Sequence, residues 1–236
     1  MARSARSGVQ GRARSGSGVG LQQSRLRVFT IAFREHRTVN AEHFDAFKLY
    51  VESGRRAEAA RSLADFVSSF VDLEEKISWT RDYLAAEGSE RPVRHELYEY
   101  VVFPSLLDGL SRSEPWSLWG LARTAQNLYR SDNLWKQVAY MTAEGFLDQL
   151  LVQCPDDDRA RKALLSELVA GMHHAVHEWP SGILYGHNGA TLHECADIVR
   201  DLAKARELDR ERMYSKFLTD FERKLSEYMD RLQPPG

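Results

Sequence analysis

Five of the eight histidines in this 236-residue chain lie within residues 171–195, GMHHAVHEWPSGILYGHNGATLHEC. His173 and His177 are four residues apart in a predicted helix, so their rings share one flank and can converge on one ion. Imidazole is a common zinc ligand, and Glu178, His187 or His193 would complete the set. The stretch therefore indicates a site for a divalent transition metal such as zinc, at which an open coordination position would activate water for hydrolysis.

A structural interpretation of the same histidines stays open. The order of residues in HHAVHE differs from the H-E-x-x-H arrangement of zinc proteases, because the glutamate follows the second histidine of the pair. His173 and His177 would then lie at the boundary of the buried face and bond to backbone or solvent. Cys195 falls on the apolar side of the next predicted helix, which suits a buried thiol better than a nucleophile.

Aromatic side chains give a second candidate for function. Trp116, Trp119 and Trp135 are three of the five tryptophans and lie within twenty residues of one another. They are either packed core rings or the lining of a groove for a ligand or peptide. The turn after the histidine-rich helix adds polar and aromatic groups. The candidate binding residues are Trp116, Trp119, Trp179, Tyr185, His187 and Asn188.

Helices are expected to position these groups. Apolar residues recur at spacings of three and four from Asn40 onward, which is typical of amphipathic helices. Pro104 is expected to kink or split one of them. The expected helices span about 40–53, 56–86, 93–111, 115–129, 134–153, 156–179, 192–206 and 209–232. The sequence therefore predicts an all-α fold of about seven or eight helices packed as antiparallel hairpins, either a helical bundle or a short solenoid resembling tetratricopeptide repeats.

Several helix ends carry recognisable capping residues. Asn40 is expected to be an N-cap, and Gly54 stands where a left-handed C-cap residue is favoured. The acidic run 156–158 is expected to cap the following helix and complement its dipole. Thr191 and Glu194 have the spacing of a capping box.

One short tract resembles part of a known repeat. Tyr50, Gly54, Ala59 and Leu63 are similar in type and spacing to the middle of a tetratricopeptide unit, in which two helices form a hairpin. Phe47 and Phe66 stand where that repeat has small residues, and no second copy follows at a fixed period. The resemblance implies hairpin packing of the first two helices.

Charge divides the chain unevenly. Residues 1–27 hold six arginines and no acid, whereas the remaining 26 lysines and arginines face all 34 acidic residues, so residues 28–236 carry about −8. The first 27 residues are also rich in glycine and serine, which predicts a disordered basic arm before a single helical domain at 28–236. An acidic body is a poor surface for nucleic acid, so nucleic-acid binding is expected only through the arm.

Other classes of protein are disfavoured by missing signals. No apolar run approaches the ~20 residues that cross a bilayer, and two cysteines are too few for a disulfide framework, so a cytoplasmic protein is expected. Neither a phosphate-binding glycine loop nor a G-x-S-x-G elbow occurs. The leading prediction is a non-enzymatic bacterial interaction module, of adaptor or immunity type, that binds a protein or peptide partner, with a basic partner suited to the acidic body. The alternative is a metal-dependent hydrolase centred on the histidines.

Overall fold

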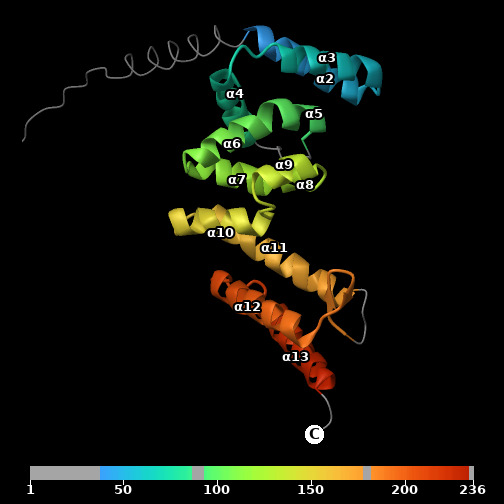
Figure 1. Ribbon diagram of the computed structural model, residues 1–236, viewed down its shortest axis with the longest axis vertical. Coiled ribbons are helices and arrows are strands. Elements are labelled where there is room, and N and C mark those ends of the chain that lie inside the picture. Colours follow the sequence, from blue (N-terminus) through green and yellow to red (C-terminus); the bar gives the residue numbers. More distant parts are fainter. Residues whose placement is uncertain (1–37, 87–92, 178–181, 234–236) are drawn as a thin grey trace, which may run out of the picture. The chain divides into compact units, whose positions relative to one another are not determined.

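The computed structural model describes residues 38–86, 93–177 and 182–233 (Figure 1). The predicted all-α fold is confirmed, since these residues form packed helices and only one very short hairpin of strands. The basic arm at 1–27 lies outside the described residues. The chain divides into two compact units, one ending at Ser69 and one beginning at Phe70, and each is described by itself.

The first unit is a helical hairpin of α2 (Thr38–Glu52) and α3 (Arg56–Ser68). Gly54 has a φ of +73° between the two helices, which confirms the predicted left-handed C-cap. The hairpin is the packing that the tetratricopeptide resemblance implies. Its core differs from that repeat, because Phe66 is fully buried with its ring centroid 5.1 Å from that of Phe44. The predicted N-cap at Asn40 is wrong, since that residue lies inside α2.

The second unit is a succession of helices, each packed on another close to it in the chain. It contains α4 (Leu73–Ala85), α5 (His95–Leu97), the π-helix η1 (Tyr98–Val102), α6 (Phe103–Ser111), α7 (Pro115–Arg123), α8 (Ala125–Leu128), α9 (Asp132–Gln137), α10 (Ala143–Gln153), α11 (Asp158–His177), α12 (Leu192–Leu208) and α13 (Ser215–Leu232). Helix α4 packs on α6, α6 on α7, α7 on α10, α10 on α11, α11 on α12 and α12 on α13 (Figure 1). The described helices differ in length and show no repeat.

Three of the predicted helices, 56–86, 115–129 and 134–153, are broken in the structure, the second of them at Thr124 between α7 and α8. Asp72 is extended and its carboxylate accepts the Glu75 amide at 2.9 Å, so α4 starts afresh after α3 has ended. Ala139 and Tyr140 both have positive φ, which ends α9 and separates it from α10. Non-glycine residues seldom adopt this conformation, and a sequence pattern gives little warning of it.

Pro104 changes the helix type without breaking the helix. The proline has no N–H for an α-helical bond, and the segment just before it is the π-helix η1. The Phe103 amide there donates to the Tyr98 carbonyl, five residues back. The wider π turn accommodates the proline, which donates no backbone hydrogen bond, and residues 95–111 stay continuously helical.

Helix α11 begins as predicted from its acidic start. The Asp157 carboxylate accepts the Arg159 and Ala160 amides at 3.0 and 3.2 Å, which satisfies two donors that the first turn leaves open. Asp158 instead pairs with Arg161, whose buried guanidinium also pairs with Glu211 at 2.7 Å. These ion pairs link the turn between α12 and α13 to the start of α11.

The chain between α11 and α12 forms a hairpin in which Leu184–Tyr185 pairs with Asn188–Gly189. The sequence predicts no strands, so this hairpin is a small correction. Gly186 has a φ of +60°, which the first turn position of a two-residue hairpin of type II′ requires. Helix α12 follows, and its predicted capping box is confirmed in both directions between Thr191 and Glu194.

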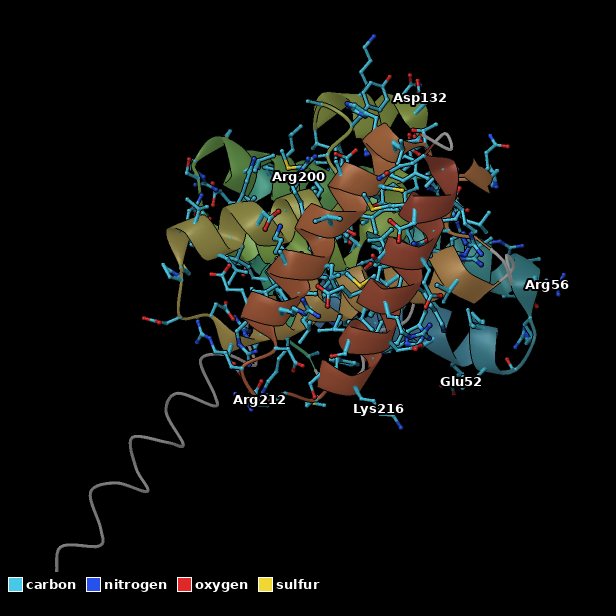
Figure 2. The ribbon with its side chains drawn as sticks, turned by 90° about the horizontal axis from the view of Figure 1, so that it is seen from below. Glu52, Arg56, Asp132, Arg200, Arg212 and Lys216 are labelled. Carbon is cyan, nitrogen blue, oxygen red and sulfur yellow. The ribbon has the colours of Figure 1, made fainter. Side chains whose placement is uncertain are left out.

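Helices α12 and α13 form the last hairpin. The Asp209 carboxylate accepts the Met213 and Tyr214 amides, both at 2.8 Å, and this tight turn delays the start of α13 to Ser215. Arg212 in the turn and Lys216 at the start of α13 lie at the same end of the two helices (Figure 2). No described helix is long and apolar enough to cross a membrane.

Candidate functional site

A pocket of about 710 Å³ lies in the second unit, and we name it the tryptophan pocket. Its walls come from the end of α4, from α7 and α10, and from the turn that leads into α11. It is lined by Arg81, Leu84, Ala85, Ala86, Pro115, Trp116, Trp119, Arg123, Leu150, Asp157 and Arg159. Two indoles and three guanidiniums therefore meet over a floor of aliphatic side chains.

The local sequence places both tryptophans on one helix. Pro115 starts α7, where its missing N–H costs nothing because no helical partner exists there. Trp116 and Trp119 are then three residues apart and share a face, with Arg123 one turn beyond Trp119. Both rings are half-buried, so the structure places them between the two interpretations drawn from the sequence, partly in the core and partly in the pocket.

Trp116 is held on two sides. Its indole Nε1–H donates to the Glu114 carboxylate, and the Arg81 guanidinium lies over its ring with Cζ 4.7 Å from the centroid. Arg81 also donates to Glu114. The hydrogen bond from Trp116, together with those of Arg81, lowers the pKa of Glu114 below its usual value. This triangle fixes the orientation of the indole before any ligand is present.

Trp119 lies under two cations. The Cζ of Arg123 is 5.9 Å from its centroid and that of Arg159 is 5.3 Å, both close enough for a cation–π attraction. Arg123 Nη1 also donates to the Leu84 carbonyl at 2.8 Å. That carbonyl belongs to the last turn of α4, so the bond ties Arg123 to the end of that helix.

Asp157 is the single carboxylate in the lining. Arg159 Nη2 lies 3.2 Å from one of its oxygens and Nε lies 3.4 Å from the other. Burial acts to raise the pKa of Asp157, but the hydrogen bonds from Arg159 and from the Ala160 amide outweigh it, and the pKa is lowered. Three guanidiniums against one carboxylate leave the lining with a net charge of +2.

The predicted binding residues are brought together only in part. Trp116 and Trp119 line the same pocket, whereas Trp179 lies outside the described residues. Tyr185, His187 and Asn188 are exposed at the tip of the β1–β2 hairpin and are not part of the pocket lining. The sequence analysis missed Arg81, Arg123, Asp157 and Arg159. The Trp119–Arg123 spacing was a usable signal for one of them, while the others reach the pocket through tertiary packing.

The predicted metal site stays a prediction. Glu178 and the side chain of His177 lie outside what the structure describes. The His173 ring stacks on Phe217, with centroids 4.0 Å apart and an interplanar angle of 21°. Within the described part of the chain, no three His, Cys, Asp or Glu side chains gather closely enough to hold a metal ion. Cys195 is fully buried, and burial raises the pKa of its thiol, as expected of an inert cysteine.

Comparison with known proteins finds no match: no protein-family model, curated protein or solved structure is significantly similar to this chain. The function has to be inferred from the geometry of the tryptophan pocket.

Proposed function

We propose that this protein is a non-enzymatic interaction module that binds a peptide segment of a protein partner in the tryptophan pocket. The observation that carries the proposal is the convergence of Trp116 and Trp119 with three guanidiniums in one hollow of about 710 Å³. Ligand pockets commonly have volumes of roughly 300–1,000 Å³. Tryptophan and arginine are also the side chains that contribute most often to the binding energy of protein interfaces.

The internal contacts of the pocket support binding by a preformed surface. Glu114 and Arg81 hold Trp116, and the Leu84 carbonyl holds Arg123 against Trp119. Side chains already fixed in this way lose little further entropy when a ligand arrives. The floor of aliphatic side chains, formed by Leu84, Pro115 and Leu150, offers apolar contact. A short peptide with both apolar and polar side chains matches this combination.

The chemistry of the lining favours binding over catalysis. Its titratable groups are three guanidiniums and Asp157. Guanidinium stays protonated at all ordinary pH values and therefore orients a ligand without exchanging protons. The lowered pKa of Asp157 makes its carboxylate a weak general base near neutral pH, and two backbone amides of α11 already occupy it.

A peptide selection tests the proposal. A phage-displayed library of random heptapeptides would be selected on the full chain, and the enriched peptides measured by fluorescence anisotropy. Trp119→Ala is expected to weaken their binding at least about tenfold, because truncating a central aromatic anchor commonly costs 2 kcal/mol or more. Trp119→Phe should weaken it less. Tyr185→Ala, at the exposed hairpin tip, is the control and should leave the affinity unchanged.

Three results would count against the proposal. These are a selection that enriches no peptide at all, enriched peptides that bind Trp119→Ala as tightly as the wild type, and a loss of binding caused by Tyr185→Ala alone. The last result would transfer the site to the hairpin. Circular dichroism of each variant shows whether a loss of binding reflects unfolding, and Trp119→Phe keeps the test valid if Trp119→Ala does not fold.

A further inference from the structure

The cations of the tryptophan pocket point to the chemical class of its ligand. We infer that the pocket recognises an acidic peptide segment, in which an aspartate or glutamate carboxylate stands beside an apolar side chain. This inference rests on the proposed function. The carboxylate would meet Arg159 and Arg123 above Trp119, and the apolar side chain would lie against Leu84 and Leu150.

The faces of the two indoles are already used by cations. Arg81 covers Trp116, and both Arg123 and Arg159 lie over Trp119. A lysine or arginine from a partner would therefore compete with these cations for the indoles, and the positive charge of the lining would repel it. An anionic group is attracted by the same charge and accepts hydrogen bonds from planar guanidiniums.

Arg159 is the donor most available to a ligand. Its side chain is 71% exposed, and its bonds to Asp157 are 3.2 and 3.4 Å long, which is loose for a pair of opposite charges. Asp157 keeps its two amide partners in α11 if Arg159 leaves. An incoming carboxylate can thus share or replace Asp157 on this guanidinium without uncapping the helix.

A carboxylate matches the available donors more closely than a phosphate group. Arg81 is held by Glu114 and Arg123 by the Leu84 carbonyl, whereas the side chain of Arg159 is largely exposed. One planar guanidinium pairs with the two oxygens of a carboxylate, whereas a phosphate monoester carries nearly two charges at neutral pH and is matched by more than one cation. Charge also rules out the protein's own segment 1–27 as the occupant, because it has six arginines and no acid. The lining of the pocket is positive, whereas residues 28–236 are negative as a whole. The partner expected from the pocket is therefore acidic, in contrast to the basic partner expected from the overall charge.

The composition of the selected peptides tests the inference. Pools selected on the wild type are expected to be enriched in aspartate and glutamate beside leucine or aromatic residues. Pools selected on Arg159→Gln should lose the acidic enrichment. Arg200→Gln is a matched control, because Arg200 is also 71% exposed and pairs with a nearby aspartate, Asp197, but lies on α12 and is not part of the pocket lining.

Binding of one enriched acidic peptide gives the quantitative arm. Arg159→Gln should weaken it about tenfold or more, since a hydrogen bond to a charged group contributes about 1.5–3 kcal/mol. Replacing the glutamates of the peptide by glutamines should cost a similar factor, and the phosphoserine version should bind no better than the glutamate version. Enrichment of basic peptides, or an equal effect of Arg159→Gln and Arg200→Gln, would overturn the inference while leaving the proposed function intact. A selection that enriches nothing would remove both.

Discussion

The guanidinium of Arg159 lies over the indole of Trp119, with 5.3 Å between Cζ and the ring centroid. Trp119 belongs to α7 and Arg159 to the first turn of α11, and both helices pack on α10. The tryptophan pocket therefore depends on how three helices of the second unit pack. Small changes in that packing should change the shape of the pocket.

Gly120 is where this packing is most restricted. A Cβ built on Gly120 would contact Leu106 Cδ2 far inside van der Waals distance and would lie 2.9 Å from Leu84 Cδ1. Both leucines are buried and cannot move aside freely. We expect Gly120→Ala to lower the free energy of unfolding by about 1–3 kcal/mol in urea denaturation, because overpacking outweighs the gain in helix propensity. Because Leu84 lines the pocket, peptide affinity should fall as well.

Gly171 provides the control for this substitution. It is a helical glycine in α11, and a Cβ there would meet nothing within 4 Å. Gly171→Ala is expected to raise the free energy of unfolding by up to about 1 kcal/mol. If the two substitutions had the same effect, the close approach of α7 to α4 and α6 would not be a real constraint.

Glu114 should make part of the stability dependent on pH. Its pKa is lowered in the folded protein by the bonds from Trp116 and Arg81, so its contribution is complete above the ordinary glutamate pKa of about 4.3 and is lost as the pH falls through the lower folded value. Glu114→Gln should therefore lower the thermal midpoint at pH 7 and have little effect at a pH below the folded value. Differential scanning calorimetry over this range measures the difference.

Glu207→Gln, at an exposed position of α12, is the control for Glu114 and is expected to stay close to the wild type at both ends of the range. A Glu114→Gln difference that grew at low pH would contradict the sign of the pKa shift. A difference that did not change with pH would show that Glu114 acts through its shape and not its charge.

Local signals in the sequence predicted the parts of the fold that depend on neighbouring residues. The left-handed Gly54, the capping box of Thr191 and Glu194, and the capping role of Asp157 follow from backbone donors and side-chain acceptors only a few residues apart. The break at Asp72 could have been found in the same way, because Asp72 and Glu75 have the spacing of a helix start. The positive φ of Tyr140 has no such signal.

The candidate site was predictable only up to the helix that carries it. The sequence places Trp116 and Trp119 on one face of one helix, and in the structure both line the tryptophan pocket. The sequence alone does not show that Arg81 and Arg159 come from other helices to cover these tryptophans, because helix packing decides which distant residues meet. The sequence also joined Tyr185 to the same candidate site, although the hairpin that carries it lies apart from the pocket lining.

The most direct measurement is the ¹H–¹⁵N spectrum of the tryptophan indoles during titration with an enriched acidic peptide. Each of the five tryptophans gives one indole signal, and single Trp→Phe variants assign them. The proposal predicts that the Trp119 signal shifts most and the Trp116 signal next, while that of Trp135, outside the pocket lining, stays in place. Shifts confined to Trp135 or Trp179, with Trp116 and Trp119 unmoved at saturation, would contradict binding in the tryptophan pocket.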